Sequence, residues 1–161
     1  MNQQAFYEDG SRILRPDAFE FVLASELKRA VRAQSFLTLI TLEARRVWDG
    51  LTVAADDGTL AEIAELVSRE VRDTDPIGQT DRGSLGLMLL EADPQGGSCV
   101  IGRVMSRIDN YRFSAPLSIS IGAASCPTHA VDAEALKREA SSRPMISARR
   151  GIHPGSTTEG L

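Results

Sequence analysis

The stretch Ile77-Gly78-Gln79-Thr80-Asp81-Arg82-Gly83-Ser84-Leu85-Gly86-Leu87-Met88-Leu89-Leu90 predicts a β-hairpin near the middle of the chain. Residues 77–80 and 85–90 have the composition of two strands, and residues 81–84 between them have the composition of a turn. The fold therefore depends on which elements precede this hairpin and which follow it.

One helix and one strand are predicted on each side of the hairpin. Before it, residues 35–42 form a short apolar, β-branched run typical of a buried strand, and a helix begins near Gly58. After it, a second helix precedes residues 117–123, which alternate as a strand does. The apolar stripes of these two helices are Leu60, Ile63, Ala64, Val67 and Val71, and Val100, Ile101, Val104, Met105 and Ile108.

Three local signals complete this part of the chain. Thr59 and Glu62 have the spacing of a capping box, which places a helix start there. Residues 44–57 show no clean period, and residues 93–97 have the composition of a loop.

Two further helices flank the core. Residues 16–34 carry apolar side chains at spacings of three and four, and Asp132 is a suitable N-cap for a short helix that Pro144 limits. The core order is strand, helix, strand, strand, helix, strand. This order predicts an α+β, ferredoxin-like βαββαβ domain with an antiparallel central sheet flanked by helices. We expect one domain over residues 1–152 and a flexible polar tail over residues 153–161.

Composition excludes several classes of protein. The chain has 161 residues, a net charge of -4 and 42% apolar residues, which is typical of one soluble globular domain and unfavourable for binding a nucleic-acid backbone. Neither a signal peptide nor an apolar run long enough to span a membrane is present. Cys99 and Cys126 form no metal motif and are expected to be reduced thiols in a cytoplasmic protein.

An ordered series of motifs resembles one bacterial signalling family. The motifs are Asp9-Gly10-Ser11-Arg12-Ile13-Leu14-Arg15-Pro16-Asp17-Ala18-Phe19, Ser118-Ile119-Ser120-Ile121-Gly122-Ala123-Ala124, Cys126-Pro127, Asp132-Ala133-Glu134-Ala135-Leu136 and Arg149-Arg150-Gly151. Together they resemble GGDEF domains, the diguanylate cyclases, over about residues 9 to 153. The resemblance implies a fold that agrees with the one read from the strands and helices.

The family's metal site is degenerate in this chain. Where the family has Gly-Gly-Asp/Glu-Glu-Phe, this chain has Asp81-Arg82-Gly83-Ser84-Leu85. The resemblance places Thr41 and Gly83 at the two positions of metal-binding carboxylates, and it leaves Glu43 on the same strand face as Thr41. Magnesium held between phosphate oxygens needs such carboxylates.

The positions that hold the nucleotide are altered as well. Asp81 and Arg82 replace the glycines that let the backbone approach the nucleotide, and Ser84 replaces the second acidic residue of the signature. Ala148 replaces a phosphate-holding lysine, and the guanine-reading residues fall near Trp48 or Asp49 and at Asp57, which is equally well part of a helix start. We therefore expect no catalytic residue, no metal, no cofactor and no cyclase activity.

One binding element of the family is retained. The resemblance implies an inhibitory-type Arg-x-x-Asp site at Arg72 and Asp75, in the family's register, with a further arginine supplied by Arg103. Arg69 and Arg107 lie within a helical turn of these residues and would extend the site into one basic patch. Guanidinium groups bind phosphate oxygens and guanine edges, and a carboxylate accepts from guanine N–H groups.

These observations favour a catalytically inactive GGDEF-like receptor for cyclic di-GMP that regulates a partner protein or a second copy of itself. The alternative is a nucleotide-independent protein-interaction or dimerisation scaffold derived from a diguanylate cyclase. The alternative remains open because the helix macrodipole also favours Arg72 at a helix end, and because Arg46 and Asp49 form a second Arg-x-x-Asp outside the family register.

Overall fold

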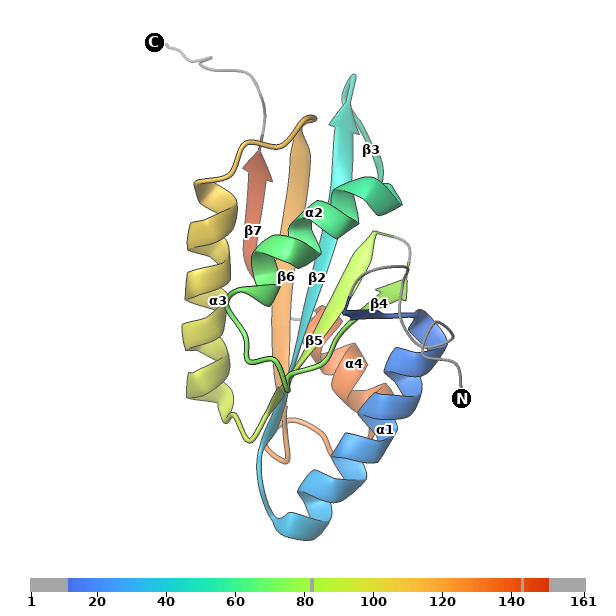
Figure 1. Cartoon of the computed structure of the whole chain (residues 1–161), viewed down its shortest axis with the longest axis vertical. Helices are drawn as coiled ribbons and strands as arrows, with labels where there is room; N and C mark the ends of the chain where they lie inside the picture. The colour runs from blue at the N-terminus through green and yellow to red at the C-terminus, as the bar shows by residue number, and fades with distance from the viewer. Residues whose placement is uncertain (1–11, 82, 143, 151–161) are drawn as a thin grey trace.

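The computed structural model describes residues 12–81, 83–142 and 144–150 (Figure 1). Arg82 of the turn and the expected tail at 153–161 lie outside the described residues. The helices and strands are β1 (Ile13–Leu14), α1 (Pro16–Ala33), β2 (Leu37–Trp48), β3 (Leu51–Ala54), α2 (Asp57–Ser68), β4 (Ile77–Asp81), β5 (Ser84–Leu90), α3 (Pro94–Asp109), β6 (Leu117–Cys126), α4 (Ala133–Ser142) and β7 (Pro144–Arg150).

The strands form one sheet in the order β1-β4-β5-β2-β6-β7, with β3 paired to the end of β2. β4 and β5 are the hairpin predicted from the sequence, and β5, β2 and β6 continue the sheet in antiparallel fashion. With α2 and α3 as the connections, this is the predicted ferredoxin-like βαββαβ core, which is confirmed. β1 lengthens the sheet by parallel pairing with β4.

Helices cover both faces of the sheet (Figure 1). α2 and α3 enclose one apolar core against the sheet, and α1 and α4 enclose a second core on the opposite face. Because side chains alternate along a strand, Leu39 of β2 belongs to the α1 side while Ile40 and Leu42 belong to the α2 side. The sheet thus separates two cores, each of which has its own surface pocket.

Phe19 of α1 packs on two glycines of the central hairpin. Gly78 on β4 lies directly opposite Gly86 on β5. A Cβ on Gly78 would lie 2.3 Å from the Phe19 ring, and one on Gly86 would lie 2.5 Å from it. The glycines therefore let α1 approach the sheet closely.

Residues 44–57, which show no period in the sequence, contain a second hairpin. β2 continues to Trp48 and turns through Asp49 and Gly50, which have φ of 51° and 80°, before it returns as β3. An Asp-Gly pair suits a two-residue turn that needs positive φ at both positions. The apolar residues Trp48, Leu51 and Val53 are exposed on this hairpin, so they follow no core-facing pattern that a sequence reading could detect.

Two helices begin differently from the sequence prediction. Asp56 rather than Thr59 caps α2, because the Asp56 carboxylate accepts the Thr59 N–H at 2.8 Å. α3 begins at Pro94, inside the segment 93–97 that was expected to be a loop. Asp93 caps this helix, and Pro94 fits the first turn because its missing N–H would have no partner there.

The C-terminal part of the fold is a helix followed by an edge strand. Asp132 caps α4 as predicted, since its carboxylate accepts the Ala135 N–H at 2.9 Å. Pro144 ends the helical segment and opens β7, which pairs antiparallel with β6. Within the described part of the chain, no helix has the length and apolarity needed to cross a membrane.

Candidate functional site

A pocket of about 640 Å³ lies between the end of α2, the first half of α3 and the end of β5. Four of the five arginine and aspartate residues predicted to bind a ligand line it: Arg69, Arg72, Asp75 and Arg103. Arg107, the fifth, lies one turn further along α3 and does not line the pocket. The volume is within the range of ligand pockets, roughly 300–1,000 Å³.

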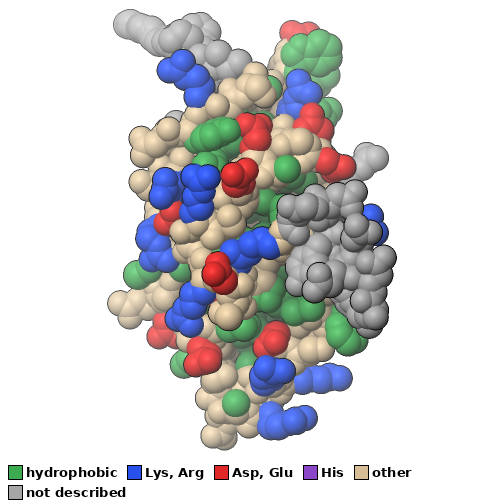
Figure 2. All heavy atoms as spheres, viewed as in Figure 1, with side chains coloured by type: hydrophobic (Ala, Val, Ile, Leu, Met, Phe, Trp, Pro, Cys, Tyr) green, Lys and Arg blue, Asp and Glu red, His purple; other side chains and the backbone are tan. Residues whose placement is uncertain are grey.

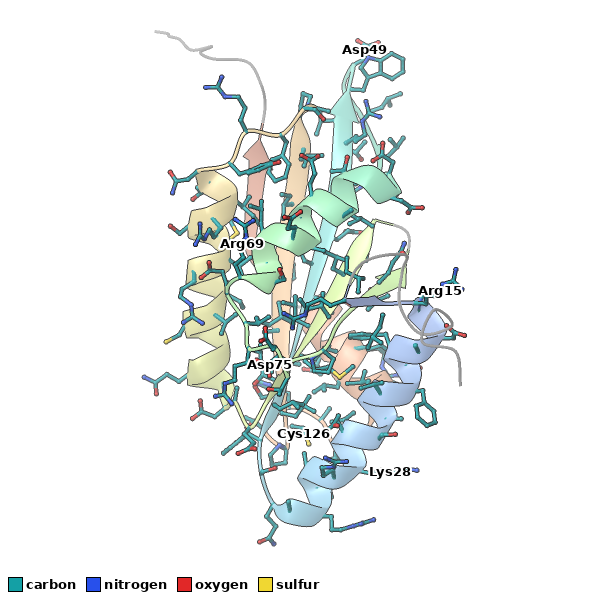
Figure 3. All side chains as sticks on the ribbon, in the orientation of Figure 1. Arg15, Lys28, Asp49, Arg69, Asp75 and Cys126 are labelled. Atoms are coloured by element: carbon teal, nitrogen blue, oxygen red, sulfur yellow. The ribbon has the colours of Figure 1, made fainter. Side chains whose placement is uncertain are left out.

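Asp75 holds the backbone of the loop after α2. Its side chain is buried, with 5% exposed. One carboxylate oxygen accepts the Arg72 N–H and the other accepts the Leu90 N–H, each at 3.1 Å. Asp75 therefore joins the loop to β5 and fixes the position of Arg72 (Figure 3). Each carboxylate oxygen retains a further lone pair for a ligand donor.

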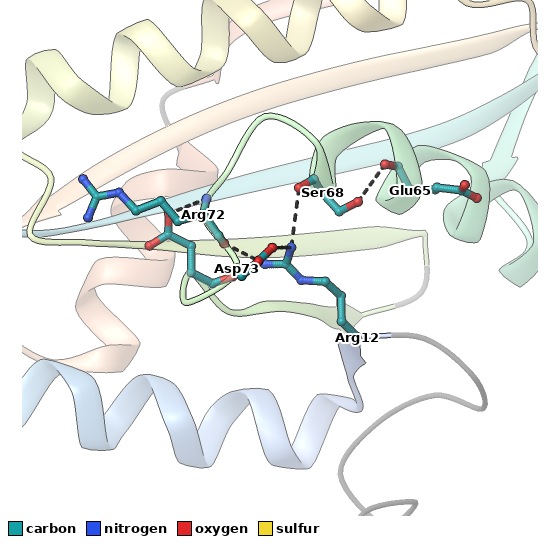
Figure 4. Close-up of polar contacts among 6 residues, drawn as sticks. Arg12, Glu65, Ser68, Arg72 and Asp73 are labelled. Carbon is teal, nitrogen blue, oxygen red and sulfur yellow. Dashed lines mark hydrogen bonds and ion pairs between the residues drawn. The ribbon is translucent and has the colours of Figure 1, made fainter.

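Arg12 ties the segment before α1 to the same loop (Figure 4). Its guanidinium donates to the Arg72 carbonyl at 2.9 Å, to the Asp75 carbonyl at 2.7 Å and to the Ser68 carbonyl at 3.4 Å. It also lies 3.8 Å from the exposed carboxylate of Asp73. No local pattern in the sequence predicts this role, because residue 12 and the carbonyls it binds are about 60 positions apart.

The side chain of Arg72 is available for a ligand. It is exposed, and in Figure 4 it points away from Arg12. Among the residues that the structure describes, no hydrogen bond or ion pair engages its guanidinium. The backbone of Arg72 is thus fixed by Asp75 and Arg12, while its charged group lies at the pocket with no partner in the described part of the chain.

Glu70 neutralises the arginines of α3. Arg107 Nε donates to its carboxylate at 2.6 Å, Arg103 Nε lies 3.5 Å from the other carboxylate oxygen, and Arg103 Nη2 donates to the Glu70 carbonyl at 2.9 Å. Figure 2 shows basic side chains gathered over α3 with acidic side chains among them. The family resemblance predicted the arginines at this site, but no sequence signal pointed to Glu70, which lies two residues before the Arg-x-x-Asp motif.

A second pocket, of about 430 Å³, lies on the opposite face of the sheet, at positions that the family resemblance assigns to a metal site. Thr41, Glu43 and Ser84 line it, so Thr41 and Glu43 share a face as strand alternation predicts. Lys137 of α4 also lines it and forms ion pairs with Glu20 and Glu134. Burial alone would lower the pKa of Lys137, but its hydrogen bonds to the two glutamates raise the pKa overall.

These residues do not fit a magnesium ion. Of the three carboxylates that line this pocket, Glu20 and Glu134 are paired with Lys137, and the exposed Glu43 lies 3.8 Å from the guanidinium of Arg45. Gly83, next to the Ser84 that pairs with Glu43, has φ of 69°, and a Cβ there would lie 2.8 Å from the Ala44 carbonyl oxygen, so this position offers no carboxylate. In the described part of the chain, no three histidine, cysteine, aspartate or glutamate side chains group together. The side chain of Asp81 and the whole of Arg82 lie outside the described residues.

The expected guanine-reading positions do not line this second pocket. Trp48 and Asp49 lie at the tip of the hairpin formed by β2 and β3, which Figure 3 shows at the far end of the molecule from α1. Asp57 is the first residue of α2. Arg46, in the second Arg-x-x-Asp copy, lies 3.9 Å from the Asp56 carboxylate and lines neither pocket.

The fold and this arrangement of pockets define an α+β domain of the ferredoxin-like class with a pocket at the α2–α3 junction that three arginines and four carboxylates line. Many solved structures resemble it, among them the following three. The GGDEF domain of FimX from Pseudomonas aeruginosa has a TM-score of 0.70 and 15% identity, with 85% of this chain and 90% of that one covered. The GGDEF domain of DgcB from Caulobacter crescentus, in complex with cyclic di-GMP, has a TM-score of 0.69 and 11% identity, with 88% and 89% covered.

The third structure is the diguanylate cyclase SiaD from Pseudomonas aeruginosa, in complex with its activator SiaC. It has a TM-score of 0.67 and 18% identity, with 87% of this chain and 56% of that one covered. No family model matches the sequence, and no curated protein matches it at a significant level. The chain has the fold of GGDEF domains.

Proposed function

We propose that this chain is a catalytically inactive GGDEF-like domain that binds cyclic di-GMP at the α2–α3 junction and regulates a partner protein in the bacterial cytoplasm. The observation that carries the proposal is the guanidinium of Arg72, which has no partner among the described residues and lines a 640 Å³ pocket together with Arg69, Asp75 and Arg103. A dianionic dinucleotide needs cationic groups for its phosphates and hydrogen-bond partners for its guanines. This pocket supplies both kinds of group.

The degenerate metal site supports the inactive part of the proposal. Transfer of a phosphoryl group depends on metal ions and on groups that hold the phosphates in position. Three carboxylates line the pocket at Thr41, but Glu43 lies beside the Arg45 guanidinium and Glu20 and Glu134 are paired with Lys137, while nearby Gly83 has no room for a side chain. The proposed protein therefore responds to the nucleotide without making it.

A partner protein fits the receptor role because a protein without its own activity can act only by binding something else. SiaD shows that a protein with a GGDEF fold can associate with another protein. For this chain the partner is a protein or a second copy of the chain. Nucleic acid is an unsuitable partner, since the net charge is -4 and acidic residues lie among the arginines.

Calorimetric titration of the full chain with cyclic di-GMP and, separately, with GTP tests the proposal. We expect saturable binding of cyclic di-GMP and much weaker binding of GTP. An absence of saturable cyclic di-GMP binding at concentrations well above those of cellular second messengers would refute the receptor function.

The nucleotide-independent scaffold is the second candidate, and a different observation favours it. Trp48, Leu51 and Val53 are 76%, 67% and 57% exposed on the hairpin formed by β2 and β3. Trp48 is opposite Leu51 in the register, so these apolar groups lie on one face of the hairpin. Grouped exposed apolar side chains are typical of protein-interaction surfaces. Association that persists without nucleotide and is lost in Leu51→Asp would support this candidate.

A further inference from the structure

Glu70 places a carboxylate on the arginines that a bound phosphate would use. Its side chain is only 11% exposed, whereas those of Arg103 and Arg107 are 54% and 52% exposed. Arg107 Nε donates to one carboxylate oxygen at 2.6 Å, and Arg103 Nε lies 3.5 Å from the other. Glu70 also lines the pocket with Arg103, while Arg107 does not.

A carboxylate and a phosphodiester compete for the same kind of partner. Both carry one negative charge, and both accept paired hydrogen bonds from a guanidinium group. A phosphate that contacts Arg103 must therefore displace Glu70 from it or lie beside the Glu70 carboxylate. In the first case an ion pair is lost, and in the second case two like charges come close together.

We propose that the Glu70 carboxylate competes with the phosphate of the ligand for the Arg103 guanidinium. This competition raises the concentration of cyclic di-GMP that is needed to fill the pocket. This inference rests on the proposed receptor function and adds to it a residue that sets its threshold. Arg72, whose guanidinium is unpaired among the described residues, makes the first contact with the ligand, and Arg103 is released from Glu70 to make the second.

Glu70→Gln in the full chain tests the competition, because it removes the charge and keeps the shape. We expect calorimetry to show about two- to fivefold tighter cyclic di-GMP binding, the size expected when a partly exposed ion pair is removed. We also expect a lower melting temperature without ligand, because the link between the end of α2 and α3 is weakened. Opposite changes in affinity and stability distinguish competition from a purely structural role.

Glu62→Gln is the matched control. The Glu62 carboxylate accepts a hydrogen bond from the Tyr111 hydroxyl at 2.7 Å, so it links α2 to the segment after α3. Glu62 does not line the arginine pocket. This variant should lower the melting temperature and leave the affinity for cyclic di-GMP unchanged.

The outcomes separate this inference from the function on which it rests. If the unmodified protein binds cyclic di-GMP and Glu70→Gln binds it equally or more weakly, Glu70 is not a competitor and the receptor function stands. If only Glu70→Gln binds, competition is supported and the natural chain is not a receptor. If neither protein binds, both proposals are overturned.

Discussion

The backbone N–H of Ala44 donates to the carbonyl of Gly83 at 2.8 Å, and the carbonyl oxygen of Ala44 lies 2.8 Å from the place where a Cβ on Gly83 would be. Gly83 has φ of 69°, a conformation that other residues adopt only with strain. β2 and the residues after β3 therefore close the position at which the family resemblance expects a metal-binding carboxylate. The positive φ of Gly83 and its close contact with Ala44 disfavour a carboxylate side chain at this position.

The first prediction is that the protein forms no cyclic di-GMP from GTP with Mg²⁺ or Mn²⁺. The residues at Thr41, Glu43 and Gly83 cannot hold a metal ion between phosphates. Chromatography of the reaction mixture against a control without enzyme checks this. Steady product formation that Glu43→Ala abolishes would contradict it.

The double substitution Thr41→Asp with Gly83→Glu should not create activity. It should also lower the free energy of unfolding by about 1–3 kcal/mol, because Gly83→Glu forces a side chain into a strained position against the Ala44 carbonyl. Urea unfolding measures this loss. Thr41→Asp alone places a carboxylate that faces the pocket, and its free energy of unfolding should be close to that of the unmodified protein. It therefore serves as the control.

The second prediction concerns the arginines of the pocket. Arg72→Ala and Arg103→Ala should weaken cyclic di-GMP binding by roughly ten- to a hundredfold, since each removes a charged hydrogen-bond partner. Cys99 offers a simple assay, because it is exposed at the same pocket while Cys126 is buried. A bound ligand should slow modification of Cys99 by a thiol reagent.

Arg46→Ala and Asp49→Ala are the controls for that prediction, since this second Arg-x-x-Asp copy lines neither pocket. They should leave binding unchanged. If binding survives both Arg72→Ala and Arg103→Ala, the ligand is correct and the proposed site is wrong.

The third prediction is that Asp75→Asn lowers the free energy of unfolding by about 1–3 kcal/mol. The buried carboxylate accepts two backbone N–H groups, and an amide can accept only one of them while its own NH₂ faces the other. Urea unfolding checks the change. Asp73→Asn, at an exposed carboxylate 3.8 Å from Arg12, should change stability by less than about 0.5 kcal/mol. Equal effects of the two substitutions would contradict the structural role of Asp75.

The fourth prediction is a pH dependence at the start of α2. The hydrogen bond from the Thr59 N–H lowers the pKa of Asp56 from its ordinary value of 3.8. A lowered folded-state pKa means that the stabilisation is present above pH 3.8 and is lost as the pH falls through the folded-state pKa. Asp56→Ala should therefore cost about 1 kcal/mol at neutral pH and progressively less in acid.

Asp56→Asn separates the cap from the charge. Asparagine caps helices nearly as well as aspartate, so this variant should lose little stability at neutral pH. Unfolding curves of the unmodified protein, Asp56→Ala and Asp56→Asn, recorded at neutral pH and near pH 3, measure these differences in stability. A cost for Asp56→Ala that does not diminish in acid would show that the Asp56 charge does not stabilise the cap.

The fifth prediction uses Trp48, the sole tryptophan of the chain. Because its indole is 76% exposed, dilute protein should show the red-shifted emission of a hydrated tryptophan and efficient quenching by acrylamide. If the hairpin is a docking surface, emission should shift to the blue when the protein associates. Blue-shifted, protected emission in the dilute monomer would show that the hairpin packs against the domain instead.

The sequence by itself determined the core of this protein. Its elements follow from local patterns, which are the strands on either side of residues 81–84, the apolar stripes of α2 and α3, and the alternation in β6. Each pattern is the one that a helix or strand needs in order to bury one of its faces. They were sufficient to predict the ferredoxin-like order. The resemblance to GGDEF domains, rather than a local pattern, placed Arg72, Asp75 and Arg103 together, and all three line one pocket.

Tertiary structure alone decided what those residues do. The hairpin of β2 and β3 was not predicted, because its apolar side chains face solvent and leave no core-facing period. The carbonyls that Arg12 binds lie about 60 positions further along the chain, and the arginines that Glu70 binds lie more than 30 positions away, so neither role has a local pattern. Hydrogen bonds and ion pairs depend on distances of a few ångströms between segments that only the folded chain brings together. The sequence therefore pointed to the arginines near the pocket, and the fold decided which carboxylates lie among them and which charges are already paired.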